Sequence, residues 1–259
     1  MQRTLTFLLL LASASLAHAN DNRLTLTLGQ TDFTHDLGYR DTTTLEYRAS
    51  HGDNTFVVEA AHGARDYGKD GDTFYGQSWT GTFARDWTDA FATRTRFTAS
   101  SDDPVFANRI LEQEVIFNGF DDVSLSVGGR RTHYYDGVKA TGWYATAAWS
   151  LDQYSLRYRF IHHDIDHARD GNGHLASVRR ADREGTGNWQ AWLGRGTSVH
   201  DYEWAPLAQI GDYRSIAVRR VQPLTASLSL NLDVDHAHYD RPVASYEGLG
   251  ARVGLAYAW

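Results

Sequence analysis

Bulky apolar side chains alternate with small or polar ones along most of this chain, most clearly in its last nine residues. In 251–259, Val253, Leu255, Tyr257 and Trp259 alternate with glycine, alanine and one arginine. Successive side chains of a strand point to opposite faces, and a strand with lipid on one face needs an apolar group at every second position. This ending is therefore typical of the closing strand of an outer-membrane β-barrel.

The same period of two recurs in fourteen segments bounded by turn residues. The predicted strands are 23–34, 42–50, 54–62, 73–84, 90–100, 109–118, 123–134, 139–149, 153–164, 174–181, 186–195, 211–221, 225–236 and 244–259. A merged pair of strands would give twelve instead. An even number of strands places both ends of the chain on one side of the membrane, which we expect to be the periplasmic side.

The connections between these segments alternate in length. Short ones fall at 51–53, 85–89, 119–122, 150–152, 182–185 and 222–224, and longer ones tend to intervene, notably at 62–72, 101–108, 165–173, 196–210 and 237–243. Bacterial barrels have short periplasmic turns and longer external loops. The chain is therefore predicted to be all-β, folded as a transmembrane antiparallel up-and-down β-barrel. A soluble β-sandwich also alternates, but it would not need a terminal aromatic strand.

The start of the chain agrees with an envelope location. It has a basic residue at Arg3, an apolar run over 5–11, and Ala17 and Ala19 in the positions of a cleavage site. These features predict a signal peptide over 1–19 and a barrel domain over 20–259. The apolar run is too short to cross a bilayer as a helix, and no later stretch is long enough.

Composition narrows the function classes. The formal net charge is −7 and no basic tract occurs, so nucleic acid is not an expected partner. Cysteine is absent, which excludes disulfides and thiol nucleophiles, and no cofactor is expected. The mean hydropathy of −0.48 excludes a helical membrane protein. We expect a monomer that contacts outer-membrane lipid and lipopolysaccharide and that meets the barrel-assembly machinery through its C-terminal strand.

The polar rows of the predicted strands carry charges of both signs, and facing inward they would line a lumen. The candidates are Glu46, Arg48, Glu59, Arg94, Arg96, Glu112, Glu114, Arg157, Arg159, Arg179, Arg220, Asp233, Asp235 and Arg252. One interpretation is a hydrophilic path that orients a passing solute, as charged rings do in channels. The other is a network of ion pairs that fills and stiffens a modest barrel.

From about Arg131 onward the chain resembles the YaiO family of outer-membrane β-barrel proteins. The matching patterns are Tyr134-Tyr135-Asp136-Gly137-Val138 with Thr141-Gly142-Trp143, then Trp192-Leu193-Gly194-Arg195-Gly196-Thr197-Ser198, then Gly211-Asp212-Tyr213-Arg214-Ser215, and the final strand. The resemblance implies a barrel whose biochemical role is poorly defined. An association of this barrel with the synthesis or export of surface polysaccharide is an analogy only. It transfers no catalytic residue. The terminal Trp259 departs from the phenylalanine usual at barrel ends.

Two groups near the predicted outer rim could bind a ligand. Imidazoles and carboxylates around His162, His163 and His167 could bind a metal ion or activate water, although barrel rims are polar in any case. In the loop 196–210, aromatic rings beside carboxylates suit a saccharide. The saccharide candidates there are Asp201, Tyr202, Glu203 and Trp204. The alternative for this loop is a plug packed over the lumen.

The leading hypothesis is a narrow channel or surface factor for saccharide or exopolysaccharide passage, without enzymatic activity. A structural or adhesive surface barrel with a plugged lumen is the second, and a hydrolase built on the histidine and aspartate residues of the outer rim is the third. A channel needs a continuous hydrated lumen, whereas a structural barrel would have a packed one.

Overall fold

Fourteen antiparallel strands form one closed barrel in the described part of the chain, residues 22–69, 71–101, 103–135, 137–166, 170–183, 187–197, 211–241 and 245–259 of the computed structural model. The strands are β1 (Arg23–Phe33), β2 (Tyr39–His51), β3 (Asn54–Asp66), β4 (Thr73–Asp86), β5 (Phe91–Ser100), β6 (Arg109–Phe117), β7 (Val123–His133), β8 (Lys139–Leu151), β9 (Tyr154–Ile165), β10 (Gly171–Ala181), β11 (Asn188–Thr197), β12 (Asp212–Pro223), β13 (Leu228–Asp240) and β14 (Tyr246–Ala258). The prediction of fourteen strands is confirmed over the alternative of twelve.

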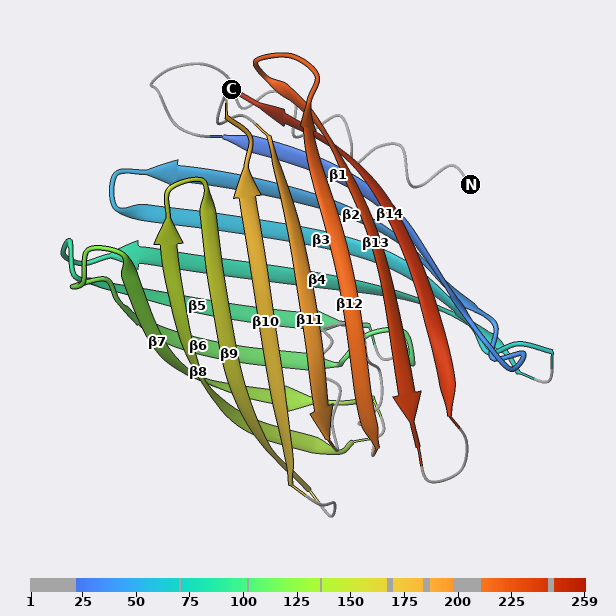
Figure 1. Cartoon of the computed structure of the whole chain (residues 1–259). Helices are drawn as coiled ribbons and strands as arrows, with labels where there is room; N and C mark the ends of the chain where they lie inside the picture. The colour runs from blue at the N-terminus through green and yellow to red at the C-terminus, as the bar shows by residue number, and fades with distance from the viewer. Residues whose placement is uncertain are drawn as a thin grey trace.

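Each strand pairs with its neighbours in the sequence, and β1 pairs with β14 to close the sheet (Figure 1). At the seam the backbone N–H of Asn22 donates to the carbonyl of Trp259 at 3.2 Å, and the N–H of Trp259 donates back at 3.1 Å. Closure leaves no sheet edge, which is what a structure exposed to hydrocarbon requires, because unpaired backbone groups are costly there. No helix in the described residues is long and apolar enough to cross a membrane.

The two ends of the barrel differ, as the connection lengths predicted. The end at which β1 begins and β14 ends, called the terminal end, has tight turns such as 52–53 and 152–153. Gly52 and Asp152 have φ of 53° and 50°, the left-handed backbone that a tight hairpin needs. The opposite end, called the loop end, carries longer connections such as 101–108 and 198–211. Figure 1 shows the first and last strands beginning and ending at the same end.

The two faces of the sheet have opposite character. Leu26, Val58 and Leu193 on the outer face are 43%, 52% and 60% exposed, whereas Thr25 and Thr80 on the inner face are 8% and 7% exposed. A soluble protein would bury the apolar row, so this outward placement is that of a barrel surrounded by lipid.

Aromatic side chains gather on the outer face near both ends. At the terminal end the Phe56 and Phe83 rings lie 4.9 Å apart, and near the loop end Trp143 and Phe160 lie 5.5 Å apart. Rings at these levels match the interfacial girdles of membrane barrels.

Candidate functional site

The lumen contains a cavity of about 740 Å³, called the main cavity, along the inner faces of β1 to β3 and β10 to β14. Its neutral polar lining includes Thr25, Thr27, Thr42, Thr44, Asn188, Ser229 and Asn231. Its charged lining consists of Arg23, Arg40, Glu46, Glu59, Arg179, Arg219, Asp233 and Arg252. Hydroxyls and amides both donate and accept hydrogen bonds, so the wall of this cavity suits a polar solute.

Arginine dominates the charges on the inner face, although the whole chain is acidic. Strand positions that share the face of the cavity lining carry twelve arginines and no lysine: Arg23, Arg40, Arg48, Arg65, Arg94, Arg96, Arg130, Arg157, Arg159, Arg179, Arg219 and Arg252. The same face carries seven carboxylates: Glu46, Glu59, Asp86, Glu112, Glu114, Asp233 and Asp235. The described strands therefore give the lumen a positive balance.

Some of these arginines are paired and others are not. Arg219 donates to Asp233, and Arg252 donates to Asp235. Within the described residues, Arg48, Arg157 and Arg179 form no ion pair with a carboxylate. Their guanidinium groups can bind an anion in the lumen without first breaking a bond to the protein.

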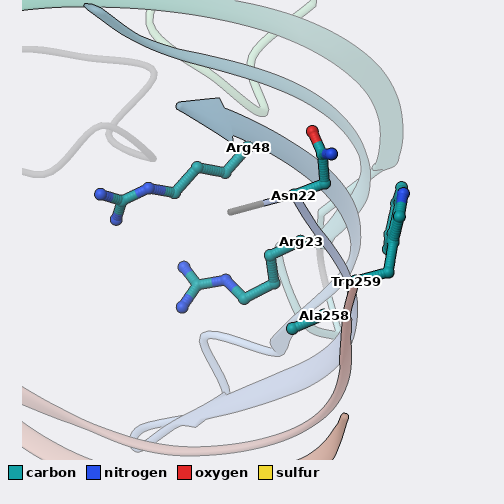
Figure 2. Close-up of a pocket in the computed structure, with 5 residues that line it drawn as sticks. All are labelled: Asn22, Arg23, Arg48, Ala258 and Trp259. Carbon is teal, nitrogen blue, oxygen red and sulfur yellow. The ribbon is translucent and has the colours of Figure 1, made fainter. Parts of the chain in front are cut away.

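A smaller cavity of about 410 Å³ lies at the terminal end, lined by Asn22, Arg23, Arg48, Ala258 and Trp259. Arg23 and Arg48 are register partners, and Figure 2 shows both side chains extending into the lumen while the Trp259 ring lies on the other side of the strand. This mouth of the barrel is therefore positively charged. Arg23 forms an ion pair of 3.3 Å with Glu46.

The inner wall of β5 to β9 is filled by a second group of charges, called the wall cluster: Arg94, Glu112, Glu114, Tyr144 and Arg159. Glu114 is 1% exposed. It accepts hydrogen bonds from Arg94, from Arg159 at 3.1 Å, and from Ser126 at 2.6 Å.

Two further contacts join the wall cluster into one network. Tyr144 donates to Glu112 at 2.7 Å, and the Arg159 guanidinium lies 4.0 Å from the centre of the Tyr144 ring. These mutual bonds make the wall cluster a packed part of the lumen, in contrast to the main cavity.

The connection between β5 and β6 covers part of the lumen at the loop end. Its residues Val105 and Phe106 are 1% and 2% exposed. They lie against Gly63 of β3 and Gly76 of β4, which are register partners. A Cβ on Gly63 would lie 2.9 Å from Phe106, and one on Gly76 would lie 2.9 Å from Val105. The two glycines therefore provide the space into which this loop, called the lid loop (103–108), folds.

Thirteen of the fourteen lumen candidates of the sequence lie on the inner face, but they divide between two regions. Glu46 and Asp233 line the main cavity, and Arg48 lines the smaller cavity at the terminal end. The wall cluster contains Arg94, Glu112, Glu114 and Arg159. Arg96 and Arg157 lie on the same face of β5 and β9. Asp235 accepts a hydrogen bond from Arg252. Arg23, Arg40 and Arg219 were not selected from the sequence, although extending the period of two from their neighbours would have found them.

The placement of Arg220 in the lumen is wrong. It shares the outer face with its register partners Trp189 and Leu232, because Arg219 takes the inner position. Its guanidinium donates to Asp182 at 2.8 and 2.7 Å. This bond lowers the pKa of the Asp182 carboxyl in the turn after β10.

The histidine candidates do not form one site. His162 lies on the outer face and shares a hydrogen bond of 2.9 Å with Asn172, whereas His163 is buried on the inner face beside Gly142. Neighbouring residues of one strand point to opposite faces, so these two cannot bind one ion together. Among the described residues, no group of three or more histidine, aspartate or glutamate side chains could hold a metal ion. Several candidates lie outside the described residues. They are His167, the predicted signal peptide, and the saccharide candidates Asp201, Tyr202, Glu203 and Trp204.

Comparison with known families identifies a membrane β-barrel family for this chain. The model of the YaiO membrane beta barrel domain matches residues 21–203. The match includes the part of the barrel before Arg131, where the resemblance of the sequence patterns began, and it ends before the pattern at 211–215.

Solved structures share the fold at low sequence identity. The CymD monoaromatic hydrocarbon channel has a TM-score of 0.66 at 7% identity, over 92% of this chain and 88% of its own. The toluene transporter TodX of Pseudomonas putida has a TM-score of 0.59 at 8% identity, over 94% and 90%. An anion-selective porin from Comamonas acidovorans has a TM-score of 0.51 at 10% identity, over 93% and 99%. These similarities concern the fold of an outer-membrane barrel.

Proposed function

Because the chain belongs to the YaiO membrane β-barrel family, we propose that it is a narrow outer-membrane channel for anionic solutes, with acidic saccharides as the substrate class. The terminal end faces the periplasm and the loop end faces outward, since short turns and long loops divide in this way in bacterial barrels. The observation that carries the proposal is the excess of arginine on the inner face.

The chemistry of the main cavity supports this substrate class. Guanidinium groups bind carboxylates through two parallel hydrogen bonds, and unpaired Arg179 lines the same cavity as neutral side chains such as Thr27 and Asn231. A uronate or similar sugar needs both kinds of partner, a cation for its carboxylate and hydroxyl or amide groups for its own hydroxyls. An anion-selective porin with the same fold gives a precedent for charge selection in such a barrel.

Neighbouring arginines offer a matched test. Arg179 lines the main cavity, whereas Arg180 lies on the outer face, its guanidinium 5.9 Å from the centre of the Tyr154 ring. In planar bilayers under a salt gradient, we expect the wild-type protein to pass anions preferentially. Arg179→Gln should lower the anion-to-cation permeability ratio about twofold, because one charge of the lumen field is lost, and Arg180→Gln should leave it unchanged.

Blockade by sugars tests the substrate class. An acidic oligosaccharide should interrupt the current of the wild-type channel, and a neutral oligosaccharide of the same length should do so only at much higher concentration. A cation-selective channel, or equal effects of Arg179→Gln and Arg180→Gln, would falsify the proposal.

A structural barrel with a closed lumen is the second candidate, favoured by the wall cluster and the lid loop. Those two features fill the inner side of β3 to β9 with protein contacts. The same recordings separate the two candidates, because a closed barrel that is correctly folded would give no discrete openings in either variant.

A further inference from the structure

Four basic residues gather on the outer face of β6, β7 and β8 near the loop end. This outer basic patch consists of Arg109, Arg131, His133 and Lys139. Arg109 pairs in register with His133, and His133 with Lys139, while Arg131 lies two residues before His133 on the same face. Arg109, Arg131 and Lys139 are exposed. Their neighbours Ile110, Thr132 and Ala140 are buried at 2%, 5% and 4% on the inner side, which places the patch outside the barrel.

The patch is unfavourable for the barrel by itself. Arg131 pairs in register with Leu111 and Thr141, so it lies diagonally opposite both Arg109 and Lys139, within reach of their long side chains. Like charges this close repel, and no described carboxylate forms an ion pair with Arg109, Arg131 or Lys139. Acidic residues lie at its border on the β9 side. Asp164 is the register partner of Thr141, and the backbone N–H of Asp166 donates to the carbonyl of Lys139. An external anion would relieve the repulsion.

The patch lies directly beyond the lipid-facing surface. On the terminal side of it the outer face carries Leu111, Val115, Val127 and Trp143, which are 54%, 45%, 62% and 52% exposed. With a rise of about 3.4 Å per residue and a tilt of about 40°, His133 lies roughly 26 Å along the barrel axis from Val123. Since the apolar band of such barrels is about 25 Å tall, the patch is at its far border.

We propose that the outer basic patch binds the phosphate groups of lipopolysaccharide, the phosphorylated glycolipid of the outer leaflet. A glycolipid fits better than free phosphate because its acyl chains would lie on the apolar residues next to the patch while its phosphates meet the cations. Arginine pairs with phosphate through two parallel hydrogen bonds. This assignment rests on the proposed function only for the orientation of the barrel, with the loop end outward.

The test measures binding of lipid A to the refolded, lipid-free protein in detergent by native mass spectrometry. The triple variant Arg109→Gln, Arg131→Gln, Lys139→Gln should lose lipid A affinity by about tenfold or more, because several charge-assisted bonds are lost. A matched variant removes three outward cations at the terminal end, Arg85→Gln, Arg180→Gln and Arg220→Gln, and should bind lipid A as the wild type does. Lipid A without its phosphates should bind the wild type as weakly as intact lipid A binds the patch variant.

Equal losses in the two triple variants would overturn the proposal, as would undiminished binding of lipid A without phosphates. Complete displacement of lipid A by millimolar inorganic phosphate would also overturn the proposal, because the acyl chains would then contribute nothing to binding. The patch variant should retain wild-type conductance and anion selectivity. A conducting barrel that does not bind lipid A would therefore overturn the lipopolysaccharide site and leave the proposed channel intact. A barrel that binds lipid A but does not conduct would support the site and overturn the channel.

Discussion

Glu114 is the most deeply buried charge among the described lumen residues. Taking a carboxylate out of water is costly unless charged partners and hydrogen bonds replace the solvent. Arg94, Arg159 and Ser126 provide that replacement. The alternation of β6 predicts which face Glu114 occupies, and pairing with β5 and β7 brings Arg94 and Ser126 to it. Arg159 comes from β9, three strands away, and the curvature of the sheet around the lumen brings it to Glu114.

Glu114→Gln should lower the free energy of unfolding by about 3 kcal/mol, because it leaves two arginines without their shared carboxylate. Guanidinium unfolding in lipid vesicles measures the change. Glu46→Gln is the control, since the side chains of Glu46 and Arg23 are 29% and 45% exposed and such a pair contributes about 0.5 kcal/mol. Equal costs for the two variants would contradict the assignment of the wall cluster as a packed element.

At the scale of elements, the lid loop is the feature that the sequence did not reveal. It has no period of two, so it was identified only as one of the longer connections. Its inward fold depends on Gly63 and Gly76, which lie about forty and thirty residues earlier and make room for Val105 and Phe106. Tyr67 donates to the carbonyl of Pro104 at 3.1 Å and attaches the loop to the end of β3.

Replacing both apolar residues of the lid loop, Val105→Ser with Phe106→Ser, should raise the single-channel conductance about twofold, because burial of those side chains holds the loop over the lumen and each contributes about 1.5–3 kcal/mol. Planar-bilayer recordings measure the effect. Phe120→Ser is the control, in an exposed turn at the terminal end. A lid loop that became sensitive to protease without any change in conductance would show that it does not narrow the path.

At the scale of the whole molecule, closure depends on the seam between β1 and β14. The terminal residue contributes more than backbone bonds, because the Trp259 ring stacks on Tyr47 at 6.2 Å and on Tyr257 at 5.6 Å. Tyr47 in turn donates to the side chain of Asn22 at 3.0 Å. The first strand, the second strand and the last residue thus meet at one point on the outer face of the terminal end.

Trp259→Ala should lower the free energy of unfolding by about 1–2 kcal/mol, since it removes two stacked aromatic contacts. Trp259→Phe should retain most of the stability, because its ring can occupy the same place between Tyr47 and Tyr257. Unfolding in lipid vesicles compares the three proteins. If the alanine variant were as stable as the wild type, the seam would depend on its backbone bonds alone.

The sequence by itself determined the strands, their number, their order and the face of nearly every residue, because the period of two is a local property of extended backbone and lipid requires it on the outer face. One error, Arg220, arose where two arginines follow each other in β12, because one faces inward and the other outward and alternation of charge cannot tell them apart. The tertiary structure alone decided which inner charges meet, which arginines stay unpaired, and where the lid loop rests. Those outcomes depend on contacts between strands far apart in the chain, and alternation contains no information about distance across a lumen.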